Sequence, residues 1–134
     1  MALTEAKKAL ERRLTTLSPS LPTAYEGVSF TPPATMYQRV QFLIKNPEDV
    51  TIGDTYYREQ IQMQVFVVDE PNKGTTSAIT RAELIRNLFK KGTTLLEGDY
   101  RIHVLSTPKV AGVGGVGNRV IVPVLIDVKV EVYS

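Results

Sequence analysis

The glycine-rich stretch KVAGVGGVGNRV, from Lys109 to Val120, is the part of the sequence whose residue types could bind a phosphate. Gly112, Gly114 and Gly117 fit the G-x-G-x-x-G pattern of a dinucleotide-binding turn. Such a turn must lie between a strand and a helix, because the helix N-terminus receives the pyrophosphate. Here an alternating strand, Arg119 to Tyr133, follows and the sequence then ends. We therefore interpret the stretch as a hairpin loop and predict no nucleotide cofactor.

The same loop is a candidate protein interface. A phosphate-binding loop needs a lysine and a hydroxyl residue after its last glycine, where this sequence has Asn118 and Arg119. The valines of a flexible loop are either simply exposed or covered when a partner docks. We predict that the loop from Thr107 to Asn118 is disordered in the isolated protein and becomes ordered at an interface. The candidate interface residues are Val110, Val113, Val116, Asn118, Arg119 and, in the polar turn region 46–55, Asp54.

The remaining reactive residue types do not form a recognisable active site. The sequence has no cysteine and one histidine, His103, which excludes thiolate and multi-histidine metal sites. No serine lies in a G-x-S-x-G elbow. The adjacent carboxylates Glu48–Asp49 and Asp69–Glu70 lie in predicted turns and are interpreted as solvated residues. We predict a protein that is not an enzyme, with no catalytic, cofactor or metal site.

Charge and hydropathy indicate a protein without a nucleic acid or membrane partner. The 16 basic and 14 acidic residues are spread along the chain and leave a net charge of +2. Sequence-specific nucleic-acid binding normally requires a concentrated basic patch. The charged N-terminus has no apolar signal-peptide region, and no apolar run approaches the roughly 20 residues that cross a bilayer. We expect a soluble protein made in a cytoplasm.

The periodicity of apolar residues predicts two helices and four strands in one domain, residues 1–134. Leu3, Ala6, Leu10 and Leu14 recur at helical spacing and begin the first helix. The second helix is predicted over about Thr76 to Lys91, with Gly92 just past its end. The predicted strands are 37–45, 57–68, 100–105 and 119–133, and residues 24–33 form a short extended segment. This order predicts an α+β fold with a mainly antiparallel four-stranded sheet and two helices packed on it.

The order and spacing of these elements resemble the tail terminator, or tail completion, proteins of long-tailed bacteriophages. The most specific part is PTAYEGVSFTPP, Pro22 to Pro33, after the first helix. It precedes the YQRV strand at Tyr37, a Gln-rich strand ending at Val68, and a helix ending FKKGTTL at Leu95. The closing valine-rich strand completes a resemblance that covers nearly the whole chain.

This resemblance implies a structural role. Tail terminators form a six-membered ring on the finished tail tube, stop its elongation and present the head-joining surface. The implied partners are further copies of the chain, the tail tube protein and a head completion or connector protein, with phage DNA passing through the ring. The implied location is the virion tail, after assembly in the host cytoplasm. Two alternatives are another tail or head–tail connector component of the same fold, and a small ligand-binding domain.

Overall fold

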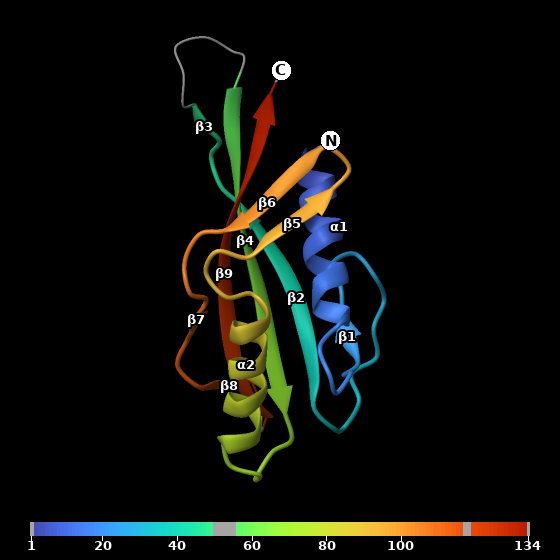
Figure 1. Cartoon of the computed structure of the whole chain (residues 1–134). Helices are drawn as coiled ribbons and strands as arrows, with labels where there is room; N and C mark the ends of the chain where they lie inside the picture. The colour runs from blue at the N-terminus through green and yellow to red at the C-terminus, as the bar shows by residue number, and fades with distance from the viewer. Residues whose placement is uncertain (1, 50–55, 117–118, 134) are drawn as a thin grey trace.

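Two long antiparallel strands form the centre of the fold, in a computed structural model that describes residues 2–49, 56–116 and 119–133. Strand β4 (Tyr56–Asp69) pairs with β9 (Arg119–Tyr133) along its whole length, from Tyr56 opposite Tyr133 to Asp69 opposite Val120. β-Branched residues alternate along β9, which suits a strand with one buried face. Figure 1 shows this ribbon running the length of the molecule. The other described strands extend the sheet from its two edges, either by pairing with β4 or β9 or, for β1 and β5, by pairing with β2 and β6.

The free edge of β4 carries two strands in tandem. Strand β2 (Tyr37–Ile44) pairs antiparallel with residues 61–68 of β4, and β3 (Glu48–Asp49) pairs with Tyr57 and Arg58. Strand β1 (Thr23–Ala24) pairs with β2 in parallel, opposite Gln38 and Arg39. The two-residue β1 is the start of the predicted extended segment.

The free edge of β9 carries three short strands. These are β6 (Tyr100–Val104), β7 (Lys109–Val110) and β8 (Gly114–Val116), each antiparallel to β9. Strand β5 (Thr94–Glu97) continues the sheet beyond β6. Five residues of the loop that was predicted to be disordered, those of β7 and β8, therefore pair with β9, and the Ala111 amide donates to the Pro123 carbonyl.

The predicted four-stranded, mainly antiparallel sheet is wrong. The described residues form nine strands in a mixed sheet of order β1-β2-β4-β9-β6-β5, with β3, β7 and β8 attached beside that path. The four predicted strands correspond to β2, β4, β6 and β9. The others have two to four residues each, which is too short for a period-two pattern to emerge. Their pairing depends on the neighbouring long strand and not on their own sequence.

Two helices cover one face of the sheet (Figure 1). Helix α1 (Ala2–Thr15) ends where the hydroxyls of Thr15 and Thr16 donate to the carbonyls of Arg12 and Arg13. Helix α2 (Thr76–Leu88) ends three residues before the predicted Lys91, and Gly92, at φ +87°, lies in the following turn. Neither described helix is long and apolar enough to cross a membrane.

The core lies between this helical layer and the inner face of the sheet. It contains the predicted inward residues of β4 and β9, including Met63, Val65, Val124 and Ile126, all fully buried. Ala6 and Leu10 of α1, with Ala82, Ile85 and Phe89 at α2, pack against them. Burying each large apolar side chain contributes about 1.5–3 kcal/mol. The other face of the sheet, called the open face, has no helix over it in the described structure.

Candidate functional site

The glycine-rich stretch does not gather its three valines into one patch. Val110 lies on β7 and packs half-buried against the core, opposite Val124 of β9. Val113, in the bend between β7 and β8, has 44% of its surface exposed. Val116 belongs to β8, while Asn118 and Asp54 lie outside the described residues. Among the described valines of this stretch, Val113 is the one that a partner can reach directly.

Arg119, the predicted interface residue at the start of β9, connects the end of the sheet to the proline-rich segment before β2. Its guanidinium donates to the carbonyl oxygens of Pro33 at 2.7 Å, Ala34 at 3.3 Å and Thr35 at 2.6 Å. It also lies over the Tyr37 ring, 5.0 Å from the centroid. These contacts anchor residues 33–37 to Arg119. The sequence did not predict this role, because the acceptors are main-chain carbonyls.

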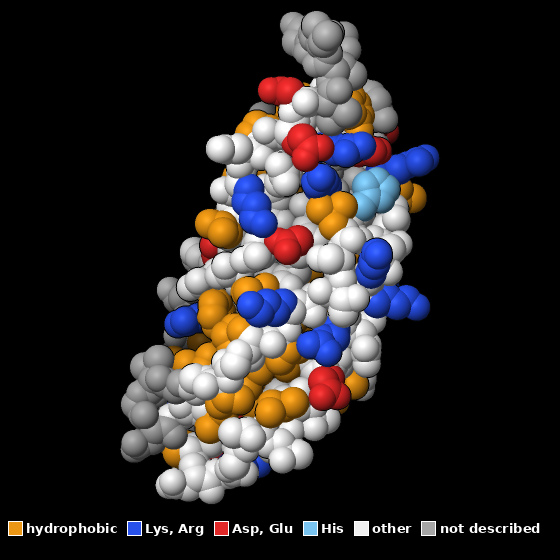
Figure 2. Space-filling view, turned by 90° about the vertical axis from the view of Figure 1, so that its left-hand side faces the viewer, with side chains coloured by type: hydrophobic (Ala, Val, Ile, Leu, Met, Phe, Trp, Pro, Cys, Tyr) orange, Lys and Arg blue, Asp and Glu red, His pale blue; other side chains and the backbone are white. Residues whose placement is uncertain are grey.

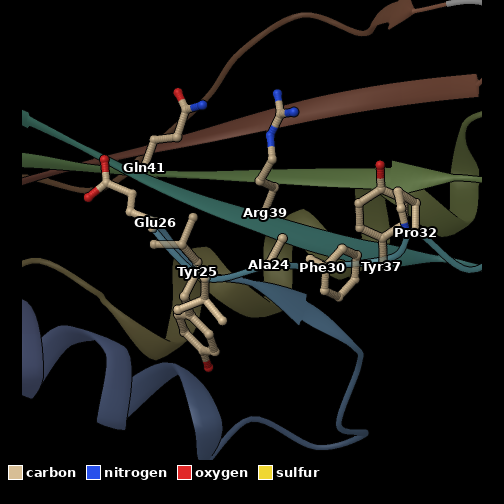
Figure 3. A pocket seen from close by; sticks show the side chains of 11 residues that line it. Ala24, Tyr25, Glu26, Phe30, Pro32, Tyr37, Arg39 and Gln41 are labelled. Carbon is tan, nitrogen blue, oxygen red and sulfur yellow. The ribbon is translucent and has the colours of Figure 1, made fainter.

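A groove of about 510 Å³ lies between β2 and residues 24–32. These residues belong to the stretch Pro22 to Pro33, which is the most specific part of the family resemblance. Figure 3 shows Phe30, Pro32 and Tyr37 gathered at one end and Glu26 and Gln41 at the other. The Phe30 and Tyr37 rings are 5.4 Å apart between centroids. An aromatic end and a polar end are features of surfaces that bind polypeptide segments.

The edge of β2 beside this groove is incompletely paired. Strand β1 covers only Gln38 and Arg39. Farther along, the Phe42 amide donates to Glu26 Oε2 at 3.1 Å. No other strand lies against this edge in the described part of the chain. An incompletely covered sheet edge can accept a strand from another molecule.

Helix α1 lies between β2 and β5, and there is a groove on each side of the helix. One groove, of about 310 Å³, is lined by Leu3 of α1 and by Phe42 and Ile44 of β2, among others. The second, of about 200 Å³, lies between α1 and β5 and includes Arg12 and Leu96. Ile44 and Leu96 are 61% and 69% exposed. Two different apolar sites therefore flank the same helix.

Charged side chains on the upper part of the open face pair with one another. Glu48 accepts from Lys129 Nζ at 3.2 Å and from Arg58 Nη1 at 3.3 Å. The hydrogen bond from Lys129, followed by its charge and that of Arg58, lowers the pKa of Glu48. His103 lies on the same face, with Nε2 3.7 Å from Glu131 Oε2. These pairs stabilise a surface, and no three metal-binding side chains converge among the described residues.

Figure 2 shows the side of the molecule that carries β7 in Figure 1. Hydrophobic side chains gather in the lower half of this view, whereas most acidic side chains lie in the upper half. A continuous apolar area on a protein surface marks a site of association. The candidate functional surface therefore consists of the grooves beside β2 and α1 and the exposed apolar side chains around them.

Comparisons with known proteins identify the family. The model of the phage tail terminator protein family matches residues 5–127. No curated protein matches the sequence. One solved structure, which carries no functional name, is 24% identical, covers 100% of this chain and 99% of its own, and has a TM-score of 0.75. A second, from the virion of a native gene transfer agent particle, is 14% identical, covers 98% of both chains and has a TM-score of 0.77. The likeness to both structures shows the fold, and the family match over most of the chain shows that this protein belongs to the phage tail terminator family.

Proposed function

We propose that this chain is the single-domain subunit of a six-membered ring that caps the tail tube, ends elongation and presents the surface for head joining. Its family consists of structural proteins of the phage tail. The observation that carries the proposal is the pair of apolar sites on either side of α1, Ile44 at the end of β2 and Leu96 on β5. A closed ring requires a heterologous contact in which one patch meets a different patch on the neighbour.

The strand order supports such a contact. β2 lies near one end of the sheet and β5 at the other, so each copy presents two unlike surfaces. The β2 site has Ile44, 61% exposed, beside Phe42 and Leu3, whereas the β5 site has Leu96 near the Arg12–Glu97 ion pair. A β2 site of one copy meeting the β5 site of the next would repeat around a ring without leaving an unmatched patch.

The other virion contacts are proposed for the glycine-rich end and for the residues between β3 and β4, which include Asp54. These regions contain the residues identified from the sequence, of which Val113 is exposed. The proposed partners are the tail tube protein on one side of the ring and a head completion or connector protein on the other. Phage DNA would pass through the ring without sequence-specific contacts. The proposed location is the virion tail, following assembly in the host cytoplasm.

Light scattering behind size-exclusion chromatography, over a concentration series, tests the ring. We expect a mass near six times 14.9 kDa for the protein alone, or an added mass of that size on tail tubes to which it binds. Ile44→Asp and Leu96→Asp should each prevent the ring, because a carboxylate would replace an apolar contact. The matched control is Leu84→Asp on α2, at a position 37% exposed and outside both grooves. A ring that forms normally in both test variants would contradict the proposed contact.

A second candidate is another tail or head–tail connector component of the same fold. It is favoured by the gene transfer agent likeness, whose description names a virion and no position within it. Binding to isolated tail tubes distinguishes the two functions. A terminator binds the tube end and prevents further growth, whereas a connector component binds the portal or its adaptor and leaves tube growth unchanged.

A further inference from the structure

Arg81, on the inner side of α2, is a buried cation with 4% of its surface exposed. Its Nε and Nη2 groups donate to Gln38 Oε1, at 3.4 Å and 3.3 Å, and Nη1 donates to the Pro19 carbonyl at 2.5 Å. A guanidinium has five N–H bonds. The other two have no acceptor within the described part of the chain. The hydrogen-bonding capacity of Arg81 is therefore only partly used.

The charge of Arg81 is also uncompensated. Its acceptors are a neutral amide and a neutral carbonyl, and no carboxylate of the described residues lies within 4.0 Å. Burial lowers the pKa of Arg81, which is the direction expected where no anion offsets desolvation. Charged groups are rarely this buried in proteins unless they are paired. The structure thus places a buried positive charge where a negative partner is missing.

A cavity of about 170 Å³ lies against this guanidinium. Leu14, Leu17 and Leu21 form apolar walls, and the exposed residues Thr15 and Ser20 lie at its mouth. One water molecule takes about 30 Å³ in the liquid. The cavity can therefore hold a carboxylate group together with a short methylene stem, and it opens to the surface between the end of α1 and β1.

We propose that this cavity binds a carboxylate, which pairs with Arg81. One negative charge matches the single buried positive charge, whereas a phosphate dianion would leave excess charge against leucine walls. The planar guanidinium fork suits the two oxygens of a carboxylate. An acidic side chain of a protein partner and a free small carboxylic acid share this chemistry. The site is independent of the ring contacts proposed above.

NMR of the Arg81 Nε–Hε resonance in the full-length protein tests the proposal, with sodium acetate as the probe and sodium chloride at equal ionic strength as the reference. We expect a saturable acetate shift in the millimolar range and a smaller, linear response to chloride. Phosphate should shift the resonance less than acetate. An acetate response no larger than the chloride response would overturn the proposal.

Two variants at Ser20 keep the test independent of damage to Arg81. Ser20→Asp places a carboxylate at the mouth of the cavity, and Ser20→Asn is its matched control of similar size without the charge. We expect Ser20→Asp to shift the Arg81 resonance without added ligand and to abolish the acetate response, while Ser20→Asn responds like the native protein. An unchanged acetate response in a folded Ser20→Asp variant would overturn the site.

Comparing acetate with a blocked glutamate, N-acetyl-glutamate methylamide, distinguishes the two sources. A side chain delivered by a partner has a methylene stem and a backbone that can contact Leu17 and Leu21, so blocked glutamate should bind about tenfold more tightly, a difference of about 1.4 kcal/mol. Equal affinities would support a free small carboxylic acid as the natural ligand. Both results support a carboxylate site, and failure of both ligands would overturn it.

Discussion

Arg81 and Arg119 each bind one end of the proline-rich segment, residues 19–35. The two guanidinium groups lie in different environments. Arg81 reaches Pro19 from α2, and Arg119 reaches Pro33 to Thr35 from the start of β9. Arg81 is buried, whereas Arg119 is half-buried and lies over the Tyr37 ring. Water can solvate the charge of Arg119 at the surface, whereas Arg81 meets solvent only through the cavity beside it. The same contact chemistry therefore supports a binding site at one end of the segment and only an anchor at the other.

The largest difference between the two ends should appear when each guanidinium is removed. Arg81→Met leaves Gln38 Oε1 and the Pro19 carbonyl without these donors in a buried site, so we expect a loss of about 2–3 kcal/mol in the free energy of unfolding. Urea denaturation measures it. The matched control is Arg86→Met on the same helix, where one hydrogen bond to Pro108 at 3.1 Å is lost. A loss from Arg81→Met no larger than that of Arg86→Met would remove the distinction between buried and accessible arginines.

Arg119→Ala should cost less, about 1 kcal/mol, because its carbonyl acceptors lie near the surface and can bind water instead. Its local effect should be larger than its global one. Amide exchange of residues 34–37 should accelerate, while exchange in the core of β4 stays unchanged. Arg101→Ala, an exposed arginine on β6, is the control. Equal acceleration in both variants would contradict an anchoring role for Arg119.

The stacked ring should contribute a smaller part of the Arg119 anchor. We expect a coupling of about 0.5 kcal/mol between Arg119 and Tyr37, because cation–π contacts at accessible sites are weak. A double-mutant cycle of Arg119→Ala and Tyr37→Leu isolates this coupling from the contact of Tyr37 with Phe30. Purely additive effects would assign the whole contribution of Arg119 to its carbonyl contacts.

The smallest expected effect concerns Glu11 of α1, which faces the proline-rich segment between the ends that Arg81 and Arg119 hold. Burial, opposed by the charge of Lys7 and supported by that of Glu26, raises the pKa of Glu11 above its ordinary value of 4.5. A raised pKa in the folded state means that folding favours the protonated carboxyl. This contribution is fully present below about pH 4.5 and is lost as the pH rises through the folded-state pKa.

Glu11→Gln should therefore flatten the decline in unfolding free energy just above pH 4.5. Urea titrations across this range measure the slope. Glu83→Gln, at an exposed position on α2, is the control and should leave the slope unchanged. A steeper decline in Glu11→Gln than in the native protein would contradict the direction of the pKa shift.

Much of the fold was predictable because the alternation of apolar and polar residues along a long strand identifies the buried face of that strand. Seven β-branched residues at every second position of β9 predicted the inner face of the central strand, and the structure confirms it. Strands β5, β7 and β8 were missed because two to four residues give no period, and their partner is supplied by β6 or β9. Of the glycines that resembled a phosphate loop, Gly114 belongs to β8 and Gly112 to the connection between β7 and β8, while Gly117 lies outside the described residues.

The sequence by itself determined the two helices, the four longest strands and the buried faces of β4 and β9, since helical and strand periods are local properties of the chain. Only the tertiary structure decided that Arg81 is buried with no carboxylate of the described residues beside it, and that Arg119 reaches carbonyls 84 to 86 positions earlier. Such contacts depend on the register of distant strands and on the path of the intervening segment. Residue types and spacing carry no information about that path, so the surfaces proposed to meet partners emerged only from the folded chain.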